Sequence, residues 1–519
     1  MPLDEYDKIA HLLRRAGFTA HPDELEVAAA RGLQATVDDL LNFERFPDVS
    51  PDPELISALD LSQEDFNRSR GEFLNKLTRW WLHAMVTTSR PLQEKMVLFW
   101  HGLFATSVWG LEFWQQIYLQ NENFRGNFDP DTGQILRPAP RNPFPVGNFR
   151  RMLEYLSKDP AMLYWLDNQF NVKKNAEVGS NENYARELHE LFSMGVEDVV
   201  AKVPNYTERD IRQASRALTG WRVLVRANGF TFPRVFIFDA ARHDFGPYEH
   251  LGKRGGTNAD FIFDNIVRHR NPGQKQSAVG RFLGYRLFAF FGYDNPEPEI
   301  INALADVFDG TTGEAPFNIR AMLRTIFTPG NIVSEAFYSE RAFRAHVKSP
   351  TEYVASLFRL LTFDRASGRP EGLPPSSPRL LRVLSNGMIQ MGQQLFAPPD
   401  VSGWREGLAW ITTTSVLARF NFATDVLGTT DSGIDIARLV AQAGLQEAIQ
   451  KNRYGDIVDF FARLLWQAPP SVEAREALTA YLQSPTPLQS TTPNSSDFVN
   501  VKIRGLIHLM LAAPDFQVS

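Results

Sequence analysis

Apolar residues recur every three or four positions along most of the chain, the spacing that places them on one face of an α-helix. Polar residues, prolines and glycines interrupt this pattern at short intervals. The segments with helical spacing are 4–17, 36–43, 71–88, 91–106, 273–292, 297–310, 318–328, 350–363, 378–396, 408–427 and 498–513. The sequence therefore predicts a mainly α fold, built as a large multi-helix array.

One segment departs from the helical pattern. Residues 221–239, WRVLVRANGFTFPRVFIFD, are rich in β-branched and aromatic residues on both sides of Asn228-Gly229. Asn-Gly is the dipeptide most typical of a tight hairpin turn, because both residues tolerate a positive φ. We expect one small antiparallel hairpin or sheet near 221–240.

The stretch NENYARELHELFSMGV, residues 181–196, predicts an amphipathic helix over 182–194 that ends at Gly195. Arg186 lies four residues from Glu182 and from Glu190, which favours a solvated face with ion pairs of about 0.3–0.5 kcal/mol each. Residues 175–201 contain no lysine, however, although lysine is the usual residue of a solvated helix face. A polar side that faces the protein interior is therefore the alternative interpretation, and both stay open.

His101 is the polar exception in MVLFWHGLFA, residues 96–105, which is apolar on every side of its helix and should be buried all round. A buried imidazole needs a hydrogen-bond partner, and the polar side of the 182–194 helix would supply one. We expect that side to face His101. A core histidine with a structural partner is the alternative to a general base or metal ligand.

A second group of candidate residues follows the predicted hairpin. ARHDFGPYEHLGKRGG, residues 241–256, begins with His243-Asp244 and carries Lys253 in a loop of the kind that often binds ligands. No helix fixes the spacing of its histidines, so the metal signal is weak, and a turn with surface basic residues is the alternative. Trp404 in PPDVSGW follows a rigid turn, where it either packs or faces a ligand. Thr207 is expected to cap a helix.

Composition and charge exclude several classes of function. The net charge is -6, which leaves no net attraction to nucleic acid or anionic membranes. The chain has no cysteine, which excludes disulfides and thiolate chemistry. No apolar run of about 18 residues predicts a membrane span. The N-terminus lacks the features of a secretion signal, so we expect a cytoplasmic protein, or a periplasmic one if a leader was removed.

Several blocks resemble the landmarks of a large bacterial family known as domain of unknown function 1800. They are HLLRRAGF, FWHGLFATS, the run from GNFRRMLEYL to NENYARELHELFSMGV, YTERDIRQASRALTGW, HDFGPYEHLG and MGQQLFAPPDVSGW. The resemblance covers about residues 8–425 and implies a long helical protein of unassigned activity, often encoded beside relatives of exported phosphatases or sulfatases. Positions that match are His101, Asp167, Asn168, Glu182, Asn183, Arg186, Glu187, Glu190, His243, Asp244, Gly403 and Trp404.

His189 departs from the family pattern, and Gly102 and Leu103 stand where relatives tend to show a second histidine. The resemblance therefore implies no essential role for His189 and weakens a two-histidine metal site at 101–103. We expect one large helical domain over 1–519, with a family-like core at 8–425, the small β excursion at 221–240 and a C-terminal helical extension at 426–519.

Three functions remain open. The first is an enzyme with a buried site, using hydrolytic or acid–base chemistry and a possible divalent metal. Its expected catalytic residues are His101, Glu182, Arg186, Glu187, Glu190, His243 and Asp244, and its expected substrate-binding residues are Asn168, Asn183, Lys253 and Trp404. The second is a non-catalytic scaffold or binding partner of the protein encoded nearby. The third is a haem or other cofactor protein with His101 as axial ligand.

Overall fold

The computed structural model describes residues 3–49, 53–59, 61, 63–173, 180–224, 235–374, 377–429, 431–484 and 498–519. Helices account for 58% of the chain, which confirms the mainly α prediction. None of the helices in these ranges is long and apolar enough to cross a membrane.

The helices of the N-terminal half lie between residues 5 and 217. They are α1 (Glu5–Ala16), α2 (Pro22–Arg31), α3 (Leu33–Leu41), α4 (Pro53–Ala58), α5 (Gln63–Thr87), α6 (Pro91–Leu103), α7 (Gln115–Phe124), α8 (Phe149–Lys158), α9 (Pro160–Trp165), α10 (Asn183–Glu190) and α11 (Glu208–Ala217).

The remaining helices are α12 (Ala259–Arg268), α13 (Ala278–Phe291), α14 (Pro298–Phe308), α15 (Ile319–Phe327), α16 (Ile332–Phe337), α17 (Pro350–Leu361), α18 (Pro378–Met391), α19 (Thr413–Gly428), α20 (Ile436–Gln442), α21 (Gln446–Gln450), α22 (Tyr454–Leu465), α23 (Val472–Gln483), α24 (Arg504–Ala512) and α25 (Pro514–Gln517). A π-helical turn over Phe498–Ile503 precedes α24, and short 3-10 turns include η3 (Asn168–Phe170) and η5 (Gly407–Trp410).

Among the described residues, the strands form two-stranded antiparallel hairpins. The pairs are β1 (Phe128–Asp129) with β2 (Gln134–Ile135), β3 (Trp221–Val223) with β4 (Phe236–Phe238), β5 (Tyr248–His250) with β6 (Lys253–Gly255), and β7 (Phe363–Asp364) with β8 (Arg369–Pro370). The pair β3–β4 is the expected hairpin, although its Asn228-Gly229 turn lies outside the described residues. The other three were not expected, because strands of two or three residues are too short for a period-two pattern.

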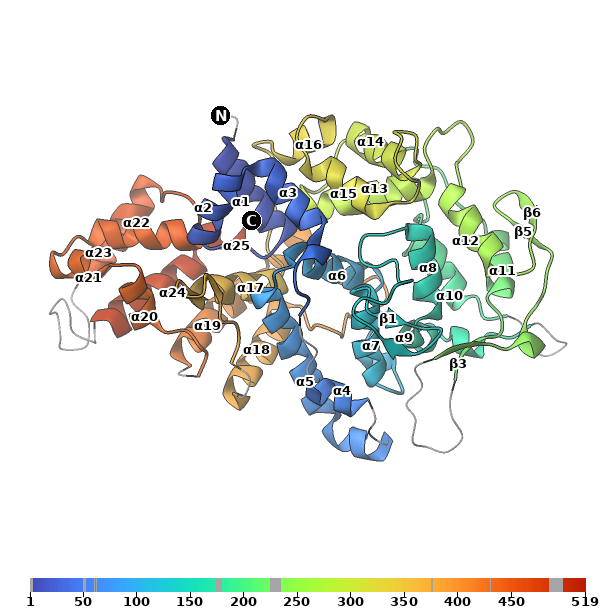
Figure 1. The fold of residues 1–519 in the computed structure, drawn as a ribbon, viewed down its shortest axis with the longest axis horizontal. Helices are drawn as coiled ribbons and strands as arrows, with labels where there is room; N and C mark the ends of the chain where they lie inside the picture. The colour runs from blue at the N-terminus through green and yellow to red at the C-terminus, as the bar shows by residue number, and fades with distance from the viewer. Residues whose placement is uncertain are drawn as a thin grey trace.

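Figure 1 shows the C-terminal helices α20–α24 at one end of the molecule and α10–α12 with β5 and β6 at the other, with α1, α5, α6 and α17 between them. A single hydrophobic cluster of buried side chains runs through this array from Ile9 to Phe516. The C-terminus returns to the first helix, where the Arg15 guanidinium donates to the Ser519 hydroxyl over 3.3 Å. The division into a core at 8–425 and an extension at 426–519 stays a prediction.

Candidate functional site

The polar side of α10 faces α11 and solvent. Both terminal nitrogens of Arg186 donate to the carboxylate of Glu208, each over 2.7 Å, and Glu182 lies 3.6 Å from the same guanidinium. Glu190 accepts a hydrogen bond from the Tyr206 hydroxyl over 3.1 Å. About one third of the Arg186 and Glu182 side chains is exposed, 34% and 35% respectively. These residues form a partly solvated set of ion pairs between neighbouring helices.

The apolar side of the same segment faces α6. The ring of Phe192, just beyond α10, contacts the ring of Phe104, just beyond α6, with centroids 5.6 Å apart. The expectation that the polar side of this helix faces His101 is therefore wrong. The physical reason is ordinary amphipathic packing, since turning Phe192 and Leu188 into the core carries Arg186 and Glu190 outward. The helix also ends at Glu190 rather than at Gly195.

His101 is buried as expected, with 2% of its surface exposed, but its partner is a backbone amide. The Phe396 N–H donates to His101 Nε2 over 3.0 Å. The imidazole is packed among the rings of Trp81, Phe396 and Trp404, with centroids 5.2–5.3 Å away. Burial lowers the pKa of His101 to about 3, so the ring is neutral at physiological pH. Because Nε2 is occupied and the ring is enclosed, His101 does not fit the axial ligand of a haem.

His243 and Asp244 are held by neighbouring structure. His243 Nδ1 lies 2.7 Å from the carbonyl oxygen of Thr219, and Nε2 lies 3.2 Å from that of Thr257. Arg216 of α11 donates to both carboxylate oxygens of Asp244, over 2.8 and 2.9 Å, and this hydrogen bonding lowers the Asp244 pKa. These contacts fasten the loop to α11. The Arg186 contact thus lies at the first residue of α11 and the Asp244 contact near its last, whereas His101 belongs to α6.

The other expected binding residues are divided between the surface and the core. Lys253 is exposed on β6, and Asn183 is exposed in the first turn of α10. Asn168 is buried in η3, where its side-chain oxygen accepts a hydrogen bond from Asn171 over 3.2 Å. Asn168 therefore has a structural partner.

Two histidines that sequence reasoning did not select form a buried pair. The Nε2 atoms of His189 and His250 lie 2.8 Å apart. Because His189 Nδ1 is 2.7 Å from the carbonyl of Ala185, it carries the proton there, and His250 is the donor between the rings. His250 Nδ1 is then a buried acceptor without a hydrogen bond from any described residue. Burial lowers the pKa of His189 to about 4 and that of His250 well below its usual value.

A metal site is not supported by the arrangement of donors. Within the described ranges, no group of three or more His, Asp or Glu side chains is placed to hold a metal ion. The possible divalent metal therefore enters none of the steps proposed below.

The structure instead gathers titratable groups around a cavity of about 40 Å³ beside Trp404, which we call the Trp404 cavity. It lies between the C-terminal half of α6, the end of α13, the N-terminus of α17 and the segment 404–410. Its lining residues are Leu98, Gly102, Ala289, Phe290, Asp294, His346, Ser349, Glu352, Gln393, Trp404, Glu406, Gly407 and Trp410. A cavity of this size holds water or the end of a larger molecule.

Glu352 is the buried acid of this cavity, with 3% of its surface exposed. It forms an ion pair with Lys95 of α6, accepts the Ser349 N–H over 2.7 Å and lies 2.9 Å from Nε2 of His346. Burial opposes its ionisation, but the Lys95 charge, the hydrogen bonds and Arg15 outweigh that effect and lower the pKa of Glu352. Glu352 is therefore the acid that stays ionised.

Glu406 and Asp294 occupy the exposed mouth of the cavity. Burial raises the pKa of Glu406, and the charges of Asp294 and Glu352 add to that rise against the opposing charge of Arg286. Because 46% of the Glu406 side chain is exposed, solvent screens part of the rise. The Asp294 carboxylate is packed against Gly407, the residue next to Glu406, so closely that a Cβ at Gly407 would collide with it. Two neighbouring acids, Asp294 and Glu406, thus flank one opening, with the buried Glu352 behind them.

Comparison with known families finds a match over nearly the whole chain. The family model described as "Protein of unknown function (DUF1800)" matches residues 11–518. The chain belongs to this family. The match continues past about residue 425, where the resemblance seen in the sequence ends, through the C-terminal helices. No curated protein and no solved structure matches the chain.

Two landmark blocks of the DUF1800 family meet at the Trp404 cavity. FWHGLF supplies Gly102 to its lining, and MGQQLFAPPDVSGW supplies Gln393 and Trp404. The two blocks touch through backbone, because Gly403 has a φ of +82° and a Cβ there would collide with the carbonyl oxygen of Gly102. Of the residues selected from sequence, Trp404 lines this cavity and His101 supports it.

Sequence analysis did not select four residues of this cavity, which are Asp294, His346, Glu352 and Glu406. They come from three separate segments, and none belongs to a known catalytic motif. The only local signal was the capping box formed by Ser349 and Glu352, which the structure contains. That pattern indicates the start of a helix and says nothing of a site.

Proposed function

We propose that this protein is an enzyme that performs general acid–base hydrolysis on a substrate of which one end enters the Trp404 cavity. The observation that carries the proposal is the placement of two exposed acids, Asp294 and Glu406, at one opening, with the buried, ion-paired Glu352 behind them. The raised pKa of Glu406 and the lowered pKa of Glu352 agree with it. Neighbouring titratable groups with pKa values moved apart are the usual basis for separate acid and base roles.

In this proposal Glu406 is the general acid and Asp294 the general base. Asp294 would take a proton from a water molecule as that water attacks the substrate, while Glu406 would give a proton to the departing group. Lys95 and His346 fix the charge and position of Glu352, whose field raises the proton affinity of Glu406. The roles of these side chains need no bound metal.

The lining also indicates the class of substrate. Three carboxylates, Asp294, Glu352 and Glu406, repel phosphate and sulfate groups, so an uncharged or cationic substrate is favoured. Trp404 and Trp410 offer flat aromatic walls against which a sugar ring or a cationic group can pack. A neutral glycoside or an amine-bearing amide fits both features.

His101 is a positioning residue in this proposal. Its ring packs against Trp404 and its Nε2 fixes the backbone at Phe396, eight residues before Trp404. A neutral imidazole sealed among aromatic rings is suited to holding the cavity wall and unsuited to exchanging protons with a substrate. Its expected role as a general base or metal ligand is replaced here by support of Trp404.

The test compares the wild-type protein with Glu406→Gln in a mixture of extracted bacterial metabolites, followed by mass spectrometry between pH 5 and 8. We expect the wild-type protein to consume one uncharged or cationic compound and Glu406→Gln to do so at least about 100-fold more slowly. Glu299→Gln, an exposed acid on α14, is the matched control and should keep the wild-type rate. Consumption by Glu406→Gln at the wild-type rate, or no consumption by the wild-type protein, would refute the proposal.

A second candidate function is a non-catalytic scaffold, favoured by the α10–α11 ion pairs. The bidentate contact of Arg186 with Glu208 fixes the register of these two helices and occupies the polar side that was expected to do chemistry. Under this proposal Arg186→Ala should lower the melting temperature and leave binding of the neighbouring gene's product by the folded fraction unchanged. Loss of that binding at an unchanged melting temperature would contradict a purely structural role.

A further inference from the structure

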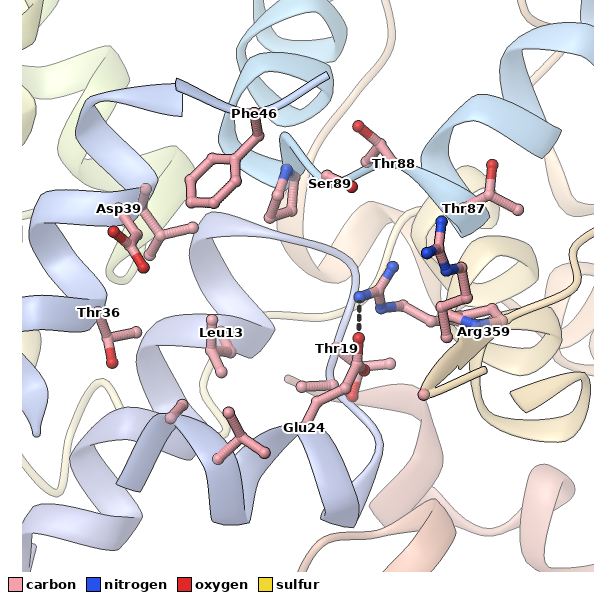
Figure 2. A pocket seen from close by; sticks show the side chains of 18 of the residues that line it. Leu13, Thr19, Glu24, Thr36, Asp39, Phe46, Thr87, Thr88, Ser89 and Arg359 are labelled. Carbon is pink, nitrogen blue, oxygen red and sulfur yellow. Dashed lines mark hydrogen bonds and ion pairs between the residues drawn. The ribbon is translucent and has the colours of Figure 1, made fainter. Parts of the chain in front are cut away.

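A larger cleft, separate from the Trp404 cavity, lies at the other end of α6 and α17 (Figure 2). Its volume is about 440 Å³, within the range typical of small-molecule sites. Helices α1, α2 and α3 form one side, and the 87–91 segment, the end of α17 and the β7–β8 hairpin form the other. We call it the Arg369 cleft. A hollow of about 720 Å³ adjoins it and shares Arg369 and Thr88 in its wall.

One part of the Arg369 cleft is apolar. Leu13, Ala28, Leu40, Phe46 and Pro91 supply hydrocarbon surface to its lining. In Figure 2, Leu13 and Phe46 lie on the side of the cleft away from Arg359. This surface can bury an alkyl or aromatic body of a ligand, at about 25 cal/mol per Å² removed from water.

The other part carries positive charge. Three arginines line the cleft, Arg31, Arg359 and Arg369, against two carboxylates. Each carboxylate is already committed, because Arg31 lies 2.6 Å from Asp39 and Arg359 donates to Glu24 over 2.6 Å. One positive charge is therefore left over in the lining.

Arg369 is the arginine without a partner. It is exposed on β8, and its guanidinium has no hydrogen bond or ion pair with any residue that the structure describes. Arg359 adds a fixed positive charge, since the residue is only 7% exposed. One terminal nitrogen of its guanidinium donates to Glu24, and the other donates to the Val86 carbonyl over 2.7 Å. The Arg359 Nε–H is buried and has no acceptor among the described residues. An unsatisfied buried donor is costly, and a nearby anion would reduce that cost.

We propose that the Arg369 cleft binds a small amphipathic carboxylate. The carboxylate pairs with Arg369 beside the fixed charge of Arg359, and the apolar body lies against Leu13 and Phe46. A planar guanidinium matches a planar carboxylate in two parallel hydrogen bonds. Glu24 and Asp39 in the same lining repel a dianion, which favours a carboxylate over a phosphate.

The test is calorimetric titration of the full-length protein with octanoate and with 1-octanol, which share a chain and differ in charge. We expect octanoate to bind with one site per chain and at least about tenfold more tightly than 1-octanol, the ratio given by one charge-assisted hydrogen-bonded contact. Equal affinities for the two probes, or no octanoate binding, would overturn the proposal.

Arg369→Gln then locates the site. Because this side chain is exposed and makes no hydrogen bond or ion pair with described residues, its replacement should leave the circular dichroism spectrum unchanged and lower octanoate affinity about tenfold toward that of 1-octanol. Arg365→Gln is the control, since Arg365 is on the same hairpin but pairs with Asp23 over 2.8 Å and does not line the cleft. Octanoate affinity that is unchanged in Arg369→Gln, or equally reduced in Arg365→Gln, would contradict the assignment.

Discussion

Lowering the pH should weaken the folded protein through His101, and the structure gives the size of that effect. Burial lowers the folded-state pKa of His101 to about 3, whereas an unfolded histidine has a pKa of about 6.5. Between these values only the unfolded chain binds the proton. The contribution of His101 is therefore fully present above about pH 6.5 and is lost as the pH falls toward 3.

The magnitude follows from linkage for a single group. Between pH 7.5 and 5.5 the free energy of unfolding should fall by about 1.4 kcal/mol because of His101 alone. In His101→Gln this loss disappears, while the amide oxygen of glutamine can still accept the Phe396 N–H. His101→Leu also removes the titrating ring, but leucine cannot accept the Phe396 N–H. This variant should therefore lose about 2 kcal/mol more, to the same extent at both pH values, because that N–H is left buried without an acceptor.

Urea unfolding of the three proteins at pH 7.5 and 5.5, followed by far-ultraviolet circular dichroism, measures these differences. The other histidines are the same in all three proteins, so their contributions cancel in the comparison. We expect the pH-dependent loss to be about 1.4 kcal/mol smaller in both His101 variants than in the wild-type protein. An identical loss in the wild-type protein and His101→Gln would refute the conclusion that this ring is held neutral by burial.

Two further predictions concern packing around the Trp404 cavity. Gly403→Ala should lower the free energy of unfolding by about 2–4 kcal/mol in urea titration, because it combines a positive φ with a collision against the Gly102 carbonyl. Gly313→Ala, with a φ of +94° and open space around it, should cost only about 1 kcal/mol, and equal losses would argue against the collision. Lys95→Met should cost about 3–5 kcal/mol by leaving Glu352 as an unpaired buried charge. Adding Glu352→Gln should recover part of that loss in a double-mutant cycle, and a further additive loss would contradict the ion-pair account.

The periodicity of the sequence determined most of the helices and the position of one hairpin. It also predicted correctly that the run 96–105 is buried, since every residue in it except Gly102 is buried in the folded chain. The Thr207 cap of α11 was correct because a capping box depends on residues three apart. Helix ends were less well placed, as α19 begins at Thr413 instead of Leu408 and a 3-10 turn occupies the residues before it. Such short turns depend on packing as much as on local preference.

Only the tertiary structure decided which groups meet. A hydrophobic pattern fixes the buried side of a helix, and for α10 that was correct, but it does not say what lies opposite the polar side. The partner of His101 is a backbone amide 295 residues away, and the acids of the Trp404 cavity come from segments that share no motif. Local preference acts over a few residues. The hydrogen-bond partner of a buried group, in contrast, can come from any part of the chain that the fold places beside it. The sequence alone therefore determined the helices and the family, and the packing of those helices decided where chemistry can occur.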